Sequence, residues 1–165
     1  MVVWLIGISG AGKTTLGNKL KKYYNVENTN SFILDGDIVR DFYDNDLGFS
    51  KEDRIANIKR IMLSAYVLEK NGIIPIICNI SPFENLRDFA RNKFDDYNEI
   101  YLYKDLETAQ SNDVKGVYKD NIDKTPLVGV DMVFEEPKHS CLKIEVDKED
   151  VGISFKKIID YLESK

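Results

Sequence analysis

The chain has 165 residues, 43% of them hydrophobic and 31% charged, which is the size and composition of one soluble domain with its own core. Its formal net charge of −5 offers no overall positive field, so nucleic acid and anionic membranes are not expected as partners. One histidine and two cysteines argue against a metal cluster, a Ser-His-Asp triad and a disulfide framework.

The first apolar run, residues 2–6, leads directly into a glycine-rich loop. The run is too short for a membrane span, and no basic segment precedes it as in a signal peptide. We therefore expect a buried strand here and a cytoplasmic protein.

Apolar runs and amphipathic stretches alternate along the rest of the chain. The predicted strands are residues 2–6, 31–34, 73–80, 99–103 and 142–146. The predicted helices are residues 14–23, 51–71, 83–94, 106–111 and 153–162. Ser50 and Gly72 should cap the longest helix, and Pro75 must lie near the start of its strand or on an edge. This alternation predicts one α/β domain over residues 1–165, with a parallel sheet and helices on both faces.

Residues 7–14 match the pattern GxxxxGK[ST], between a predicted strand and a predicted helix. In this context the loop N–H groups and the helix N-terminus surround phosphate oxygens. Lys13 is expected to reach the β- and γ-phosphates of ATP, and Thr14 to hold Mg²⁺. The predicted ATP-binding residues are Gly7, Ile8, Ser9, Gly10, Ala11, Gly12, Lys13, Thr14 and Thr15.

Two carboxylates, Asp35 and Asp37, follow the second predicted strand. Ligands bind beyond the carboxyl ends of parallel strands, so both should lie beside the phosphate loop. Asp35 is the stronger candidate for a base that accepts a hydroxyl proton or for a partner of the metal. Asp37 either shares this chemistry or caps a helix.

Positive and polar side chains close to these acids suit a negatively charged molecule that accepts the phosphoryl group. Arg54 and Asn57 lie one turn apart on the predicted helix 51–71. With Arg40 they could grip a phosphate-like group, or the arginines could form salt bridges with nearby acids. Phe49 could stack on a planar base or pack in the core.

Residues 113–137 are rich in charge, glycine and proline and show no clear period. A stretch of about 25 residues without regular structure is unusual inside a compact domain. It is either a disordered insertion or a lid that closes over substrate, and its mixture of charged and aromatic residues favours the lid.

Taken together, these residues resemble the adenylylsulfate kinase family. The resemblance is carried by residues 34–40 (LDGDIVR), 46–50 (DLGFS), 53–58 (DRIANI), 80–83 (ISPF), 87–88 (RD), 113–118 (DVKGVY), 129–131 (GVD), 134–135 (FE) and Pro137. It covers nearly the whole chain and implies the three-layer P-loop kinase fold, with residues 113–137 as the lid, and a homodimer.

The family reaction is the phosphorylation by ATP of the ribose 3′-hydroxyl of a nucleotide that carries a 5′-phosphosulfate. The resemblance implies that the catalytic residues are Lys13, Asp35 and Asp37, with Thr14 and Asp35 on the metal. It implies that the acceptor-binding residues are Arg40, Phe49, Arg54, Asn57, Ile80, Ser81, Lys115 and Leu127. Within this set Ser81 would position the substrate through its hydroxyl, and Lys115 belongs to the lid.

The chain departs from the family where the base of the acceptor nucleotide is expected to be held between aromatic side chains. Leu127 and Val128 occupy the positions of a phenylalanine-threonine pair, Glu84 replaces an arginine, and residues 109–113 lack another arginine. Loss of the phenylalanine removes a stacking partner worth about 1 kcal/mol or more. The acceptor is therefore either adenylylsulfate or another 5′-modified nucleotide, such as cytidine diphosphoramidate in surface-polysaccharide modification. A nucleotide-binding module without catalysis is the third alternative.

Overall fold

Parallel strands form one sheet in the order β2-β3-β1-β4-β5 in the computed structural model, which describes residues 1–113, 116–119, 125–139 and 142–165. The strands are β1 (Val2–Ile6), β2 (Ser31–Asp35), β3 (Ile74–Cys78), β4 (Tyr97–Tyr103) and β5 (Leu142–Glu145). The helices are α1 (Lys13–Val26), α2 (Gly36–Phe42), α3 (Lys51–Lys70), α4 (Glu84–Lys93), α5 (Leu106–Ser111) and α6 (Val151–Glu163). All of these strand pairs are parallel, which confirms the predicted α/β architecture.

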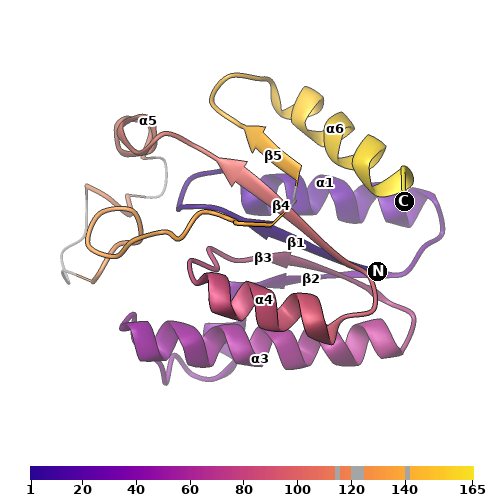
Figure 1. The fold of residues 1–165 in the computed structure, drawn as a ribbon, viewed down its shortest axis with the longest axis horizontal. Coiled ribbons are helices and arrows are strands. Elements are labelled where there is room, and N and C mark those ends of the chain that lie inside the picture. The colour runs from indigo at the N-terminus through magenta and orange to yellow at the C-terminus, as the bar shows by residue number, and fades with distance from the viewer. Residues whose placement is uncertain (114–115, 120–124, 140–141) are drawn as a thin grey trace.

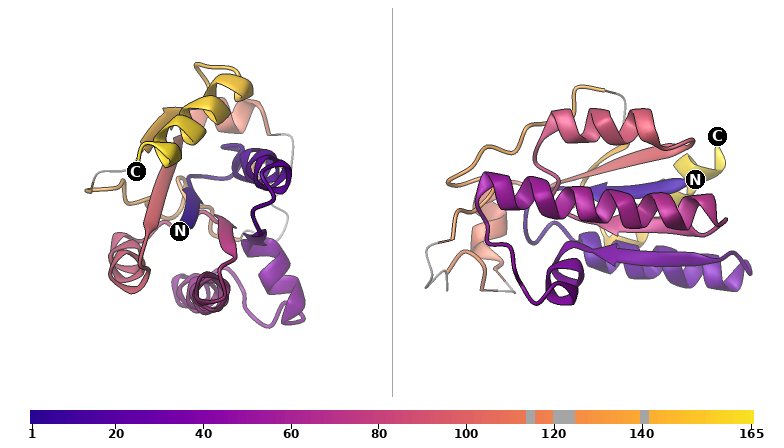
Figure 2. Two further views of the ribbon diagram at one scale, coloured as in Figure 1. Left: turned by 90° about the vertical axis from the view of Figure 1, so that its right-hand side faces the viewer. Right: turned by 90° about the horizontal axis from the view of Figure 1, so that it is seen from below.

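Helices cover both faces of the sheet, as Figure 1 and the turned views of Figure 2 show. Alternate side chains of β1 enter two cores. Val2, Trp4 and Ile6 pack with residues of α3 and α4, whereas Val3 and Leu5 pack with residues of α1 and α6. Each of these five side chains is at most 1% exposed, since a central parallel strand is buried on both faces.

The predicted elements are present with small shifts at their ends. At the start of α3 the Ser50 hydroxyl accepts the Asp53 N–H at 3.1 Å, and Gly72 follows the helix with φ of 71°. Pro75 is the second residue of β3 and so lies near the start of its strand, as predicted.

Helix α2 is the element that the sequence did not predict, because its seven residues are too few to show a helical period. Its N-cap is Asp35, whose carboxylate accepts the Asp37 N–H at 3.0 Å. The capping role considered for Asp37 therefore belongs to Asp35. Since α2 begins directly after β2, Asp35 is fixed at the carboxyl edge of the sheet.

The predicted lid segment lies with α5 at the end of the sheet toward which the strand arrows point (Figure 1). Its described parts, 116–119 and 125–137, hold no helix or strand apart from an isolated bridge between Val128 and Met132. Across the described ranges, no helix combines the length and the apolar character needed to cross a bilayer.

Candidate active site

A cavity of about 700 Å³ lies beyond the carboxyl ends of β1, β2 and β3. The predicted site residues that line it are Ser9, Gly10, Gly12, Lys13, Thr14, Thr15, Asp35, Asp37, Arg40, Phe49, Arg54, Asn57, Ile80 and Leu127. The predicted residues that do not line it are Gly7, Ile8, Ala11 and Ser81. Lys115 lies outside the described residues. Segments far apart in the sequence thus converge at the sheet edge where parallel folds bind ligands.

The phosphate loop depends on its glycines. Gly7 has φ of +142°, and a Cβ there would lie 2.3 Å from the Leu102 carbonyl oxygen, so a larger residue does not fit. Gly12 is the N-cap of α1 in the left-handed conformation and supplies no side-chain cap. The positive end of the α1 dipole therefore faces the cavity, as anion binding requires.

Lys13, the expected partner of the ATP phosphates, folds back over its own loop. Its Nζ donates to the carbonyl oxygens of Gly7 at 2.9 Å and Ile8 at 2.8 Å. These bonds hold the ammonium group beside the cavity. Its flexible four-carbon stem allows it to exchange these carbonyls for phosphate oxygens.

Thr14 and Asp35 meet at the mouth of the phosphate loop. The Thr14 hydroxyl donates to Asp35 Oδ2 at 2.9 Å, while Asp35 Oδ1 caps α2. A hydroxyl and a carboxylate side by side are the hard oxygen ligands that Mg²⁺ prefers, so the donor set fits this ion. The same carboxylate faces the cavity, where it could accept a proton from a hydroxyl.

Phe49 contacts two arginines in the cavity wall. The guanidinium carbons of Arg40 and Arg54 are 4.6 Å and 5.4 Å from its ring centroid. The ring is 39% exposed, so it does not belong to the core, which was one of its two predicted roles. Phe49 lines the cavity, and its stacking on a planar base stays a prediction.

Both guanidinium groups donate to backbone carbonyls. Arg40 binds the carbonyls of residues 47–48 at 3.0 Å and 2.6 Å, and Arg54 binds those of Phe49 at 3.0 Å and Pro126 at 2.7 Å. Neither arginine forms an ion pair within the described part of the chain, so the alternative of salt bridges is not found. Burial lowers the pKa of Arg40, and burial followed by the charge of Arg40 lowers the pKa of Arg54. An anionic ligand would stabilise both charges.

Asn57 is turned toward α2 rather than toward solvent. Its Nδ2 donates to the Gly36 carbonyl at 3.1 Å, and the residue is only 2% exposed. Its Oδ1 is buried and has no hydrogen-bond partner among the described residues. An unpaired buried amide oxygen costs about 1–3 kcal/mol. Asn57 as a residue lines the cavity, but this oxygen exposes almost no surface to it.

Ser81 contacts protein groups rather than the cavity. Its hydroxyl accepts the Trp4 indole N–H at 2.9 Å and donates to Asn79 Oδ1 at 3.0 Å, and the residue is 1% exposed. Its φ of 47° lies in the left-handed region. The hydroxyl is thus occupied by protein groups, while the neighbours Ile80 and Pro82 line the cavity. Its contact with substrate stays a prediction.

Lys104 and Tyr118 line the cavity although the sequence reasoning did not select them. Lys104 Nζ donates to the Gly10 carbonyl at 3.3 Å, and the Tyr118 hydroxyl donates to the Ser9 carbonyl at 3.2 Å. The place of Lys104 just after a predicted strand was a usable signal. Tyr118 lies in a segment without a period, and its signal was its place in the motif of residues 113–118.

A smaller cavity of about 160 Å³ adjoins the phosphate loop. It shares Gly10, Gly12, Thr15 and Lys104 with the large cavity. Its other lining residues are Ala11, Leu16, Val146, Glu149, Val151 and Ser154. The phosphate loop therefore borders two recesses.

Cys78 is buried at the end of β3, whereas His139 lies at the surface. Cys78 is 3% exposed, and burial raises the pKa of its thiol to about 12, so it is a neutral buried group. His139 lies on the surface, with Nε2 3.3 Å from Asp88 Oδ1. Cys141 lies outside the described residues.

Comparison with known proteins places these observations in context. A family model described as adenylylsulphate kinase matches residues 1–145. An adenylyl-sulfate kinase of Halothermothrix orenii is 38% identical, over 100% of this chain and 90% of that protein. One of Picosynechococcus sp. is 36% identical, over 98% and 93%. The structure of the Mycobacterium tuberculosis APS kinase in complex with AMPPNP and APS is similar with a TM-score of 0.90 at 28% identity, covering 98% of this chain and 96% of that one.

Proposed function

The chain belongs to the adenylylsulphate kinase family, and we propose that it transfers the γ-phosphoryl group of ATP to the ribose 3′-hydroxyl of adenylylsulfate. The observation that carries this proposal is the contact of Thr14 with Asp35 beside the phosphate loop, in a cavity whose wall also holds Arg40 and Arg54. The groups that bind ATP, accept the hydroxyl proton and bind the anionic end of the acceptor thus line one cavity.

The donor side is built from the phosphate loop and α1. Loop N–H groups and the helix dipole bind the triphosphate, and Lys13 leaves its two carbonyl partners to bind the β- and γ-phosphates. Thr14 and Asp35 would hold Mg²⁺, which when bound neutralises charge on the phosphates. The smaller cavity beside the loop is where we place the adenine base of ATP.

The acceptor side is built from α2, α3 and the segment after β3. Arg40 and Arg54 bind the anionic 5′ group, because both are partly desolvated positive charges that donate to backbone carbonyls and form no ion pair with the described residues. Phe49 stacks on the base, and Asn57, a cavity-lining residue that holds the start of α2 through the Gly36 carbonyl, remains a proposed acceptor contact. Asp35 accepts the proton of the attacking hydroxyl, and Asp37 and Lys115 remain proposed contributors.

A second acceptor is favoured by one observation. Leu127 lines the cavity at the position where the family pattern has an aromatic residue. An aliphatic side chain stacks less well than a ring, so a smaller base in a nucleotide such as cytidine diphosphoramidate is the alternative. A purely nucleotide-binding role is disfavoured because Lys13, Thr14 and Asp35 are all retained.

Initial rates with ATP and each acceptor, measured on the same preparation, test the proposal. Adenylylsulfate should be the better substrate by kcat/KM. Faster turnover of cytidine diphosphoramidate would support the alternative, and absence of turnover with either would support the binding module. We also propose a homodimer, which light scattering would detect as twice the mass of one chain.

A further inference from the structure

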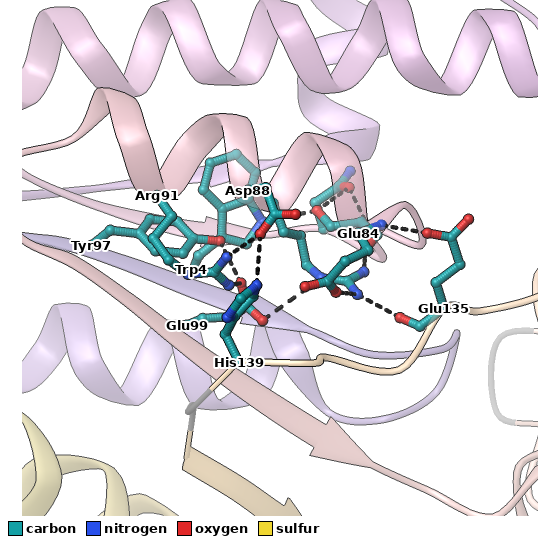
Figure 3. Close-up of polar contacts among 11 residues, drawn as sticks. Trp4, Glu84, Asp88, Arg91, Tyr97, Glu99, Glu135 and His139 are labelled. Atoms are coloured by element: carbon teal, nitrogen blue, oxygen red, sulfur yellow. Dashed lines mark hydrogen bonds and ion pairs between the residues drawn. The ribbon is translucent and has the colours of Figure 1, made fainter.

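Glu135 connects the lid segment to the turn that follows β3. Its N–H donates to the Pro82 carbonyl at 2.9 Å, and its Oε2 accepts the Glu84 N–H at 2.6 Å. Its carbonyl oxygen accepts from Arg87 Nη2 at 2.5 Å. The N–H, the carbonyl and the carboxylate of Glu135 are therefore all bonded to residues 82–87, and Figure 3 shows part of these contacts.

The contact matters for α4 because this helix lacks its own cap. Its N-cap residue is Phe83, which has no side-chain acceptor. Glu84 is the first helical residue, and its N–H would need water if Glu135 were absent. A carboxylate at a helix N-terminus also interacts favourably with the helix dipole.

Arg87 joins the same contact to the acceptor site. It is 1% exposed, its Nη1 donates to the Ser81 carbonyl at 2.7 Å, and its Nη2 also binds Glu84 Oε2. The Ser81 backbone is left-handed and unfavourable for a residue with a Cβ, so it depends on such bonds. Residues 79–82, which we call the acceptor turn, include three cavity-lining residues, Asn79, Ile80 and Pro82.

The segment before Glu135 reaches the cavity from the other side. Leu127 lines the cavity, and the Pro126 carbonyl accepts from Arg54 at 2.7 Å. Residues 127–132 form a closed turn in which the Asp131 and Met132 N–H groups donate to the Leu127 carbonyl at 2.8 Å and 3.1 Å. Residues 125–135, which we call the lid arm, are therefore attached to the domain at Glu135 and contact the acceptor site at Leu127.

We propose that Glu135 and Arg87 are positioning residues that fix the lid arm against the acceptor turn and so set the affinity for the acceptor. Neither residue lines the cavity within the described ranges. Glu135 binds the carbonyl of Pro82, which does line it, and Arg87 binds the carbonyl of Ser81, which lies between the lining residues Ile80 and Pro82. The inference rests on the proposed function, since it concerns the acceptor side of the same site. ATP binding, which depends on the phosphate loop, should be independent of both.

Variants of Glu135 test the inference because this residue is exposed, so its substitution should leave the core of the domain intact. Glu135→Ala deletes the carboxylate oxygen that accepts the Glu84 N–H, whereas Glu135→Gln keeps a side-chain oxygen that can accept it. We expect Glu135→Ala to raise KM for the acceptor about fivefold or more, from the loss of one helix cap, and to leave KM for ATP within about twofold. Glu135→Gln should restore most of the acceptor affinity. Glu27→Ala, an exposed glutamate at the far end of α1, is the matched control.

A merely stabilising role predicts a different result. Glu135→Ala would then lower the melting temperature without separating the two KM values, and that result would overturn the inference. Arg87→Lys adds a second test if it folds, because it keeps the charge and loses the planar fork. It should raise the acceptor KM in the same selective way.

A measurement without substrate separates this inference from the proposed function. The sole tryptophan, Trp4, donates to the Ser81 hydroxyl, so its fluorescence reports on the acceptor turn. Glu135→Ala should speed amide hydrogen exchange at Glu84 and Ser81 and change Trp4 emission, whereas Glu135→Gln should change neither. Unchanged exchange at residues 79–84 would reject the inference even if the enzyme phosphorylates adenylylsulfate. An inactive wild type with faster exchange in Glu135→Ala would instead reject only the proposed function.

Discussion

The Thr14 hydroxyl donates to the Asp35 carboxylate at 2.9 Å, which joins the phosphate loop to the start of α2. Asp35 uses its other oxygen to cap α2, so the backbone of that helix fixes the carboxylate. One residue therefore orients a helix and faces the cavity, and substitutions can separate these two functions.

Asp35→Asn should abolish most turnover and keep the fold. Asparagine caps helices as well as aspartate does, so the melting temperature should stay near that of the wild type. An amide cannot accept the hydroxyl proton, so kcat should fall by roughly 10²–10⁴, while ATP affinity measured without Mg²⁺ changes little. Steady-state kinetics and calorimetric ATP titration measure both quantities. Turnover close to wild type would remove Asp35 from the catalytic residues.

Arg54→Ala should weaken the acceptor selectively. A charge-assisted hydrogen bond is worth about 1.5–3 kcal/mol, so KM for the acceptor should rise by roughly 10–150-fold while KM for ATP is kept. Arg60→Ala is the control, since Arg60 lies on the same helix and pairs with Asp46 at the surface at 2.7 Å. Equal effects of the two variants would argue against a direct anion contact by Arg54.

Ser81→Ala should affect stability more than chemistry. The Trp4 indole N–H would lose its buried acceptor, at a cost of about 1–3 kcal/mol in the free energy of unfolding. Because the hydroxyl is 1% exposed, incubation with ATP alone should leave residue 81 unphosphorylated by mass spectrometry. Denaturant unfolding, with the exposed Ser111→Ala as control, measures the first effect. Stoichiometric phosphoserine at position 81 would contradict the observed orientation.

Cys78 should react slowly with alkylating reagents in the native protein. Burial raises the pKa of its thiol to about 12, so at pH 8 only roughly one molecule in 10⁴ carries the reactive thiolate. A raised pKa in the folded state also means that this thiol stabilises the fold below the unfolded pKa and loses that contribution as pH rises above about 9. Iodoacetamide labelling followed by peptide mass spectrometry checks the rate. Rapid native labelling of Cys78 would show that the thiol is accessible.

The sheet and its large helices could be predicted because residues 2–6 and 51–71 carry clear strand and helix patterns. The phosphate loop could also be predicted, since its spacing is diagnostic between a strand and a helix. Helix α2 could not, because it is too short to show a period. The inward turn of Ser81 could not be predicted either, since it depends on Trp4, 77 residues away in the sequence.

The site was predicted less completely, because its contacts join turns and segments that lie far apart in the sequence. Arg40 and Arg54 were selected as charges near the expected strand ends, and both line the cavity. Their backbone carbonyl partners come from turns that hydrophobic patterns do not encode. The role of Glu135 depends on a contact with α4 that only the folded chain brings together.

Identification of the product tests the central claim most directly. The protein is incubated with ATP, Mg²⁺ and adenylylsulfate, and the nucleotide product is analysed by mass spectrometry and phosphorus NMR. The account predicts one added phosphoryl group on the ribose 3′-oxygen, with ADP formed in equal amount. Trace turnover of adenylylsulfate beside rapid phosphorylation of cytidine diphosphoramidate, or phosphate at another position, would contradict it.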